Sequence, residues 1–256
     1  MRYGVNYRPA GLGYSGHFPP GVKWLLITNI GLFVIYFLAV RTAWGDIFAY
    51  FGLVPRMVLQ VYGVYQLGTY MFLHSPWGFG HVLFNMFALW MFGKDLELTW
   101  GTRRFLQYYF LCGIGAGVCV VVGNLLYGTL NTRTIGASGA VYGVLLAFGV
   151  LFPNTTVLFS FLFPIKAKYF VMIIGAIAFL SSIGASGGGV SHVAHLGGMV
   201  FGYFYLKSPY LKGRAGGVDL WGGLRRQYEE WKIQRARRRF EVYLRKRESD
   251  RDPWVQ

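Results

Sequence analysis

Long apolar runs separated by short polar segments dominate the first 206 residues of the chain. Six such runs extend over residues 24–40, 81–92, 105–127, 138–152, 169–183 and 190–206. A helix that crosses a bilayer needs about 20 mostly apolar residues, so the second and fourth runs cross only if flanking glycines and polar residues are included. Irregular or polar segments at that depth must be buried in protein or wet. The pattern therefore predicts an all-α polytopic membrane protein with six transmembrane helices around a partly hydrated hollow.

The segment between the first two runs, residues 41–80, is long and unusually apolar for a connection. Its apolar residues include Phe48, Tyr50, Phe51, Leu53, Met57, Val58, Leu59 and Val61. A loop of this length usually has a function, and its apolarity predicts that it is embedded in the outer leaflet of the membrane. The last outer loop, residues 184–189, reads Gly-Ala-Ser-Gly-Gly-Gly and is predicted to be flexible.

Charge divides the chain into two parts. Residues 1–206 carry eleven Lys and Arg against three acidic residues, residues 207–256 carry fourteen against seven, and the formal net charge of the whole is +15. We therefore predict a flexible cytoplasmic N-terminal segment over residues 1–22, a six-helix domain over residues 23–206 and a basic cytoplasmic tail over residues 207–256. Residues 220–247 of the tail have high helix propensity, and this basic helix is expected either to bind anionic lipid or to be a solvated charged helix. No motif predicts binding to nucleic acid.

The distribution of Lys and Arg over the short loops orients the spans. If both termini are inside, the outer loops carry only three basic residues, Arg41, Arg56 and Arg133. Cytoplasmic loops of membrane proteins are enriched in Lys and Arg, so both termini are predicted to be cytoplasmic. We expect a multi-pass protein of a prokaryotic inner membrane. The second, fourth and sixth spans then all run from outside to inside.

Four polar residues lie inside the apolar runs, where polar side chains are costly and usually functional: Ser138, His195, His81 and Asn85. At about 1.5 Å per residue, Ser138 lies roughly 21 Å, and His195 and His81 roughly 16 Å, above the inner ends of their runs. Three parallel helices are thus predicted to bring a hydroxyl, two imidazoles and an amide to a similar depth in the outer half of the membrane.

These groups suit acyl transfer. A serine hydroxyl becomes nucleophilic when a base lies within hydrogen-bond reach, and the tetrahedral intermediate needs preorganised donors for its oxyanion. We assign Ser138 as the nucleophile and His195 as the base. The Ser138 backbone N–H, the Asn85 amide and His81 are the expected oxyanion donors.

A carboxylate third member is not expected, because no Asp or Glu occurs in residues 98–218. Tyr142, one helical turn after Ser138, is placed to stack on His195 and orient it. A serine–lysine pair fails because the lysines near the spans lie at the inner face. An aspartyl pair fails for want of aspartates within the spans, and no His-Glu-x-x-His zinc motif occurs. No metal or cofactor is predicted.

Each residue alone has an ordinary explanation. A serine at a helix N-terminus is most often a cap, and a lone histidine in a span most often packs. Gly198 and Gly202 form a small-xxx-small pair, which is typical of close helix packing and would bring the sixth span against the fourth. His192 with His195 supplies too few ligands for a metal, and His74 is expected to be a loop residue. The joint occurrence of the polar groups at one depth favours catalysis.

The motifs resemble those of the rhomboid family of intramembrane serine proteases. A Gly-x-Ser-Gly element occupies residues 136–139, an Ala-His-x-x-Gly-x-x-x-Gly element residues 194–202, and a His-x-x-x-Asn element residues 81–85. The resemblance covers roughly residues 65–202. It implies a six-helix core whose apolar first outer loop is embedded in the membrane.

The resemblance also assigns roles to individual residues. It implies that Ser138 is the nucleophile and His195 the general base. His81 and Asn85 fall on the oxyanion positions of the family, with Gly136 of the serine motif supporting them, and Tyr142 falls on the position that stacks on the histidine.

The implied activity is hydrolysis of peptide bonds near the outer ends of transmembrane helices of other proteins, with the fifth span and the loop after it gating entry. A helical peptide bond hides its carbonyl, so substrates should contain Gly, Pro or other helix-weakening residues. The alternatives are an inactive rhomboid-like module that binds membrane proteins, and a channel or transporter. The chain departs from the family pattern at Tyr65-Gln66, where Trp-Arg is common.

Overall fold

The computed structural model describes residues 18–159, 163–184 and 189–208, together with residues 232 and 235. The chain divides into two units, Met1–Ser208 and Pro209–Gln256, and the fold described below belongs to the first. The N-terminal segment up to residue 17, residues 185–188 of the predicted last outer loop and nearly all of the predicted tail helix lie outside the described residues.

Most of the described residues are helical, which confirms the predicted predominance of helix. The six longest helices are α1 (Pro20–Ala39), α4 (Phe79–Trp100), α5 (Thr102–Tyr127), α6 (Ser138–Leu151), α7 (Ala167–Gly184) and α8 (Gly189–Lys207). Each corresponds to one of the six apolar runs. Within the described part of the chain, α1 and α5 are long and apolar enough to cross a membrane by length and composition, and α6 and α7 contain shorter apolar stretches.

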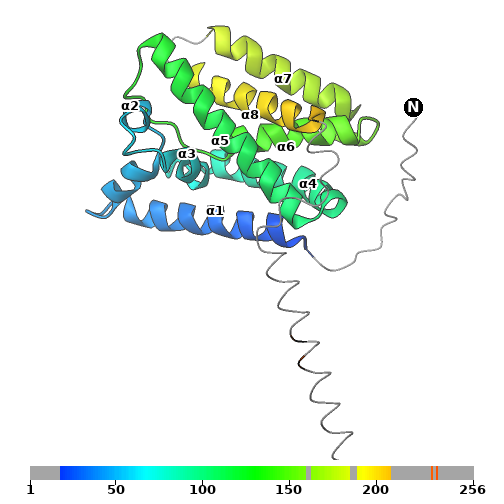
Figure 1. The fold of residues 1–256 in the computed structure, drawn as a ribbon, viewed down its shortest axis with the longest axis horizontal. Coiled ribbons are helices and arrows are strands. Elements are labelled where there is room, and N and C mark those ends of the chain that lie inside the picture. The colour runs from blue at the N-terminus through cyan, green and yellow to red at the C-terminus, as the bar shows by residue number, and fades with distance from the viewer. Residues whose placement is uncertain (1–17, 160–162, 185–188, 209–231, 233–234, 236–256) are drawn as a thin grey trace, which may run out of the picture. The chain divides into compact units, whose positions relative to one another are not determined.

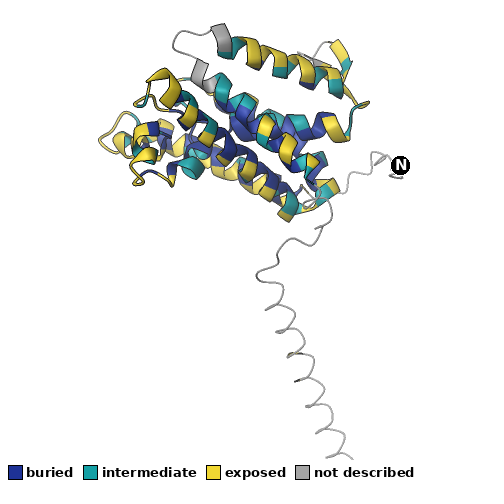
Figure 2. Cartoon of the chain, turned by 45° about the horizontal axis from the view of Figure 1, so that its top comes forward, coloured by how far each residue is buried: buried dark blue, intermediate teal, exposed yellow. Residues whose placement is uncertain are grey.

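The helices form a bundle with α6 at its centre (Figure 1). α6 packs against α4, α5, α7 and α8, while α1 contacts α4 and α5, and α7 contacts α6 and α8. Figure 2 shows buried residues on the inner faces of the helices and exposed residues on the outer faces. A helix enclosed on all sides needs apolar or small side chains all round, and α6 consists of Gly, Ala, Val, Leu, Phe, Ser and Tyr alone.

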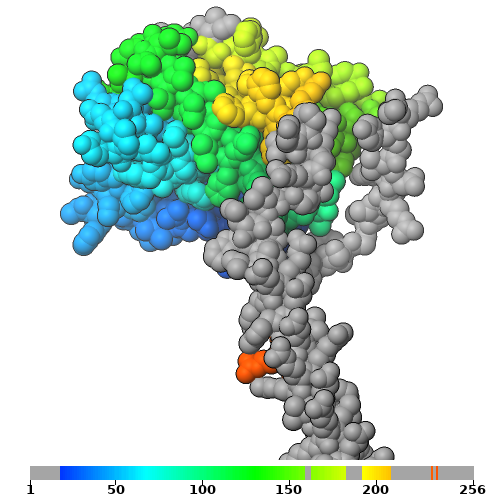
Figure 3. All heavy atoms as spheres, in the orientation of Figure 1, coloured from blue at the N-terminus to red at the C-terminus, as the bar shows by residue number. Residues whose placement is uncertain are grey.

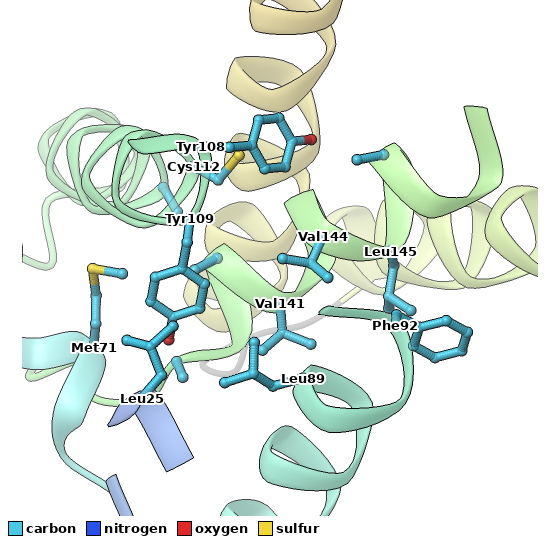
Figure 4. Close-up of a cluster of buried hydrophobic side chains, with 14 of the residues drawn as sticks. Leu25, Met71, Leu89, Phe92, Tyr108, Tyr109, Cys112, Val141, Val144 and Leu145 are labelled. Carbon is cyan, nitrogen blue, oxygen red and sulfur yellow. The ribbon is translucent and has the colours of Figure 1, made fainter. Parts of the chain in front are cut away.

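Side chains of α6 and α4 meet in the core (Figure 4). Val141, Val144 and Leu145 of α6 share one buried cluster with Leu89 and Phe92 of α4. Dispersion contacts in a close-packed core fix the helices relative to one another. The N-terminal turns of α4 and α6 are therefore held in a defined register, and these turns carry the predicted polar residues.

α8 approaches α6 closely because two glycines face each other. A side chain on Gly198 would overlap the backbone carbonyl of Gly139 in the first turn of α6. Gly202, the other member of the predicted small-xxx-small pair, lies against the Tyr108 hydroxyl of α5. Small residues at a crossing let helix backbones approach within a membrane. The approach places α8 directly beside the helix start that carries Ser138.

The apolar segment after α1 folds into short helices. They are η1 (Gly45–Phe51), α2 (Pro55–Leu59), α3 (Gln66–Thr69) and η2 (Tyr70–Phe72). Figure 3 shows α2 and α3, in cyan, beside α5, in green, and both contact α5.

Gln66 anchors this segment at the position where the family pattern has arginine. Its buried side chain donates from Nε2 to the Tyr50 carbonyl at 2.9 Å and accepts at Oε1 from the Val54 N–H at 3.0 Å. The Thr69 hydroxyl adds a 2.8 Å bond to the Phe51 carbonyl. Buried polar side chains that satisfy backbone groups hold a loop in one conformation. A glutamine amide therefore anchors the first loop in this chain.

A buried carboxylate, that of Glu97, joins the ends of α1, α4 and α5. Glu97 of α4 accepts 2.7 Å hydrogen bonds from the N–H groups of Gly21 and Val22 and from the Thr102 hydroxyl. It satisfies unpaired N–H groups at the N-terminus of α1, where negative charge is favourable. The contact ties α1 and α5 to the C-terminal turn of α4.

One element departs from the all-α prediction. β1 (Thr156–Phe159) and β2 (Phe163–Lys166) pair as an antiparallel hairpin between α6 and α7. The segment that precedes and forms β1, Pro-Asn-Thr-Thr-Val-Leu-Phe, combines turn residues with β-branched and aromatic ones. This strand signal is too short to appear in a pattern of membrane-length runs.

Candidate active site

Ser138 is the first residue of α6, and the turn before it requires glycine. Gly136 has a φ of 126°, which strains any residue with a side chain. Its N–H donates to the Tyr70 carbonyl at 2.9 Å. A Cβ on Gly136 would also lie 2.8 to 2.9 Å from the ring of His81. The backbone conformation and the contact with His81 therefore both require glycine at position 136.

His195 of α8 reaches the Ser138 hydroxyl. Its Nε2 lies 2.8 Å from Ser138 Oγ, the separation of a hydrogen bond. Tyr142 of α6 stacks on the imidazole, with ring centroids 4.1 Å apart and planes inclined by 4°. The imidazole is thus held on its face by Tyr142 and at one edge by Ser138.

His81 and Asn85 of α4 line the same cavity as the serine and His195. The cavity has a volume of about 550 Å³. Asn85 donates one N–H from Nδ2 to the His81 carbonyl at 2.8 Å, which leaves its second N–H free to face a ligand. Gly136 and Tyr142 also line this cavity.

The two remaining predicted residues, Gly198 and Gly202, do not line the cavity. They lie in the crossing of α8 with α6 and α5. Their contribution to the site is indirect, because the crossing sets the distance between the helices that carry the serine and His195.

Residues 61–208 match the family model of the Rhomboid domain. The chain belongs to the rhomboid family. Rhomboid protein 1, mitochondrial, of Saccharomyces cerevisiae is 33% identical over 133 residues, which cover 50% of this chain and 37% of that protein. Putative rhomboid protease YdcA of Bacillus subtilis is 31% identical over 141 residues, or 54% of this chain and 64% of the relative.

Rhomboid-like protein 11, chloroplastic, of Arabidopsis thaliana is 30% identical over 191 residues, which cover 71% of this chain and 62% of that protein. The chain therefore spans less than two thirds of each of these rhomboid relatives. Membership of the family identifies the chain as an integral membrane protein, as the apolar runs predicted.

His74 is a residue whose contact with His81 of the rhomboid site the sequence pattern missed. It lies in a loop, as expected, but its side chain is fully buried and its ring centroid is 5.2 Å from that of His81. Burial, and secondly the nearby His81, lower the pKa of His74 to about 3. The ring is therefore neutral and packs behind an expected oxyanion donor. Its position directly after Met71, Phe72 and Leu73 is the sequence signal of this burial.

A second cavity, of about 580 Å³, adjoins the first along α4. Phe84 and Ala88 line both cavities. Most of the other lining side chains are apolar, four of them phenylalanines, and they come from α4, α6, residues 155–158 and α7, with Lys94 and Asp95 also in the lining. The rhomboid domain thus has a nearly continuous apolar depression from the serine to the C-terminal half of α4.

The polar side chains of the first cavity are hydroxyls, imidazoles and one amide. In the part of the chain that the structure describes, no group of three His, Cys, Asp or Glu side chains is placed to hold a metal ion. A hydroxyl bonded to an imidazole, with further donors across a cavity, is an arrangement that performs nucleophilic acyl transfer.

Proposed function

We propose that this rhomboid protein is a serine endopeptidase that hydrolyses peptide bonds near the outer ends of transmembrane helices of other membrane proteins. The observation that carries the proposal is the 2.8 Å contact between Ser138 Oγ and His195 Nε2. His195 takes the hydroxyl proton as Oγ attacks the peptide carbonyl carbon, and returns it to the leaving amine as the C–N bond breaks. Water then attacks the acyl-enzyme with the same imidazole as base.

The proposed oxyanion site lies across the cavity from His195. The Ser138 backbone N–H, at the N-terminus of α6, has no partner within its helix and is one donor. His81 and the second N–H of Asn85 are the others, and Gly136 lets His81 lie against the serine turn. Several donors that share one oxyanion stabilise the charge that develops in the transition state.

The six long helices are proposed to be six membrane spans, with residues 45–72 embedded in the outer leaflet. This segment exposes many large apolar side chains, including Tyr50, Leu59, Val61, Tyr62 and Val64. The Lys and Arg bias of the loops supports cytoplasmic termini, and we propose a prokaryotic inner membrane as the location. Residues 23–206 would then form the protease domain between an N-terminal segment and a basic tail.

This topology predicts which parts of the chain an external protease reaches. Protease added to intact cells should leave residues after Lys207 attached, because the tail lies inside. Immunoblotting with a C-terminal epitope measures this, and permeabilised cells are the control in which the tail is removed. Loss of the epitope from intact cells would reverse the orientation.

The activity is tested most directly by covalent labelling. A fluorophosphonate probe should label the purified protein at Ser138, because the bonded His195 makes this hydroxyl nucleophilic, and Ser138→Ala should abolish labelling. In-gel fluorescence and peptide mass spectrometry measure the extent and the site. An unlabelled, folded wild-type protein would favour the alternative function, an inactive module that binds membrane proteins.

Transmembrane helices as substrates are supported by the second cavity. A peptide that places a carbonyl at Ser138 and continues as a helix along α4 passes the shared residues Phe84 and Ala88. From His81 to Lys94 a helix rises roughly 20 Å, so the depression accommodates most of the inner part of such a substrate. The phenylalanines, Met91, Val157 and Leu158 that line it fit apolar side chains.

Ala88→Phe is predicted to separate small from transmembrane substrates. The added ring fills the junction of the two cavities, so KM for a transmembrane substrate should rise about tenfold, a change of roughly 1.4 kcal/mol, while fluorophosphonate labelling of Ser138 stays unchanged. Cleavage kinetics in liposomes measure KM. Ile30→Phe, on an exposed face of α1, is the matched control. An unchanged KM for Ala88→Phe would contradict docking along α4.

A further inference from the structure

The second ring nitrogen of the proposed base lacks a partner. For Nε2 of neutral His195 to accept the Ser138 proton, Nδ1 must carry the hydrogen. Nδ1 is buried and has no hydrogen-bond partner among the described residues. A buried donor without a partner carries an uncompensated desolvation cost. That cost lowers the population of the Nδ1–H tautomer, which the proposed catalysis needs.

The helices that carry Ser138 and His195 contain no carboxylate that could accept a hydrogen bond from His195 Nδ1. A serine triad uses an aspartate to hold the donor nitrogen of the histidine and to stabilise the imidazolium. Residues 98–218, which include α6 and α8, contain no Asp or Glu. A buried anion in an apolar site would also carry a large desolvation cost. A neutral acceptor meets the same need at lower cost.

His192 is the neighbour that provides such an acceptor. It precedes His195 by one helical turn on α8, and side chains three positions apart lie on one helix face. The two ring centroids are 5.8 Å apart, with planes inclined by 81°. Tyr142 offers its ring face to His195, and His81 lies against Gly136 on the serine side. His195 Nδ1 makes no direct hydrogen bond to the His192 ring, and polar groups more than about 3.5 Å apart are commonly bridged by one water.

We propose that His192 is a positioning residue that accepts a hydrogen bond from His195 Nδ1–H through one bridging water. A neutral imidazole has one ring nitrogen that accepts. The bond fixes the tautomer in which Nε2 is unprotonated, and it stabilises the imidazolium formed during attack. No proton is transferred to His192. The inference rests on the proposed protease function, which it deepens by adding a third member to the dyad.

Two substitutions separate this role from a structural one. His192→Gln keeps an acceptor oxygen, whereas His192→Phe keeps a flat ring without one. His192→Phe should reduce kcat roughly 10- to 100-fold, the cost typical of losing the hydrogen-bond partner of a metal-bound histidine, with KM for a transmembrane substrate unchanged. His192→Gln should retain most of the activity. Equal loss in both variants, or no loss in His192→Phe, would overturn the proposal.

A spectroscopic measurement tests the inference without turnover. In ¹⁵N-histidine-labelled protein, His195, assigned by comparison with His195→Ala, should populate the Nδ1–H tautomer in wild type and in His192→Gln. The population should fall in His192→Phe. An unchanged tautomer in His192→Phe overturns the inference even if the enzyme is active. A changed tautomer in a protein that the fluorophosphonate does not label upholds the inference and refutes the proposed function.

Discussion

Replacement of Ser138 or His195 by alanine is expected to reduce kcat for cleavage of a transmembrane substrate by roughly 10⁴- to 10⁶-fold. The serine hydroxyl and the imidazole are 2.8 Å apart and are proposed to act as one unit. Removing either leaves only the oxyanion donors and substrate binding. The double variant should therefore be no slower than the slower single variant. Cleavage of a glycine-containing test helix in liposomes measures all three rates.

The control for this prediction comes from α7, which contacts both α6 and α8. Ser182→Ala removes a hydroxyl of α7 that donates to the Phe179 carbonyl at 2.6 Å and that does not line the cavity, so full activity is expected. Equal melting temperatures of all variants exclude misfolding as the cause of a loss. Cleavage that persists in the folded Ser138→Ala or His195→Ala protein would refute the assignment of the dyad.

The position of the candidate site was predictable because the number of residues between two points of a helix fixes the distance between them along the helix axis. Each apolar run became a helix, and an equal rise per residue places residues counted from the ends of their runs at similar height in the bundle. Ser138, His195, His81 and Asn85 accordingly line one cavity. The motif spacing added Tyr142, which lies one turn from the serine and stacks on the histidine. Height along a helix and spacing within a motif are local in sequence, whereas the pairing of Tyr142 with His195 was implied by the family resemblance.

Contacts between distant residues were not predictable in this way. Glu97 reaches N–H groups 75 and 76 positions away, and Gln66 bonds to backbone groups of a segment without regular periodicity. The burial of His74 depends on how the first loop folds back on α4. Such contacts follow from the packing of short helices and turns, for which a single sequence supplies neither a period nor a fixed spacing.

The crossing of α8 and α6 links packing to catalysis, and Gly198→Val tests this link. Any Cβ on Gly198 overlaps the Gly139 carbonyl, and backbone, unlike a side chain, cannot rotate away. Overpacking typically costs about 1–3 kcal/mol, and valine at a backbone contact should reach the upper end of that range or exceed it. Gly139 follows Ser138 directly, so the displaced carbonyl also moves the nucleophile.

The expected result is a lowered melting temperature together with a loss of cleavage of about 10²-fold or more, the cost of misplacing a reacting group by about 1 Å. Gly198→Ala should show both effects more weakly. Gly31→Val is the matched control, because a Cβ on Gly31 of α1 meets nothing within 4 Å, and it should leave activity unchanged. If Gly198→Val keeps the melting temperature and the cleavage rate of the wild type, the close approach of α8 does not position the catalytic groups. A lowered melting temperature with unaltered kcat would show that Gly198 stabilises the fold and that the distance between Ser138 and His195 is set elsewhere.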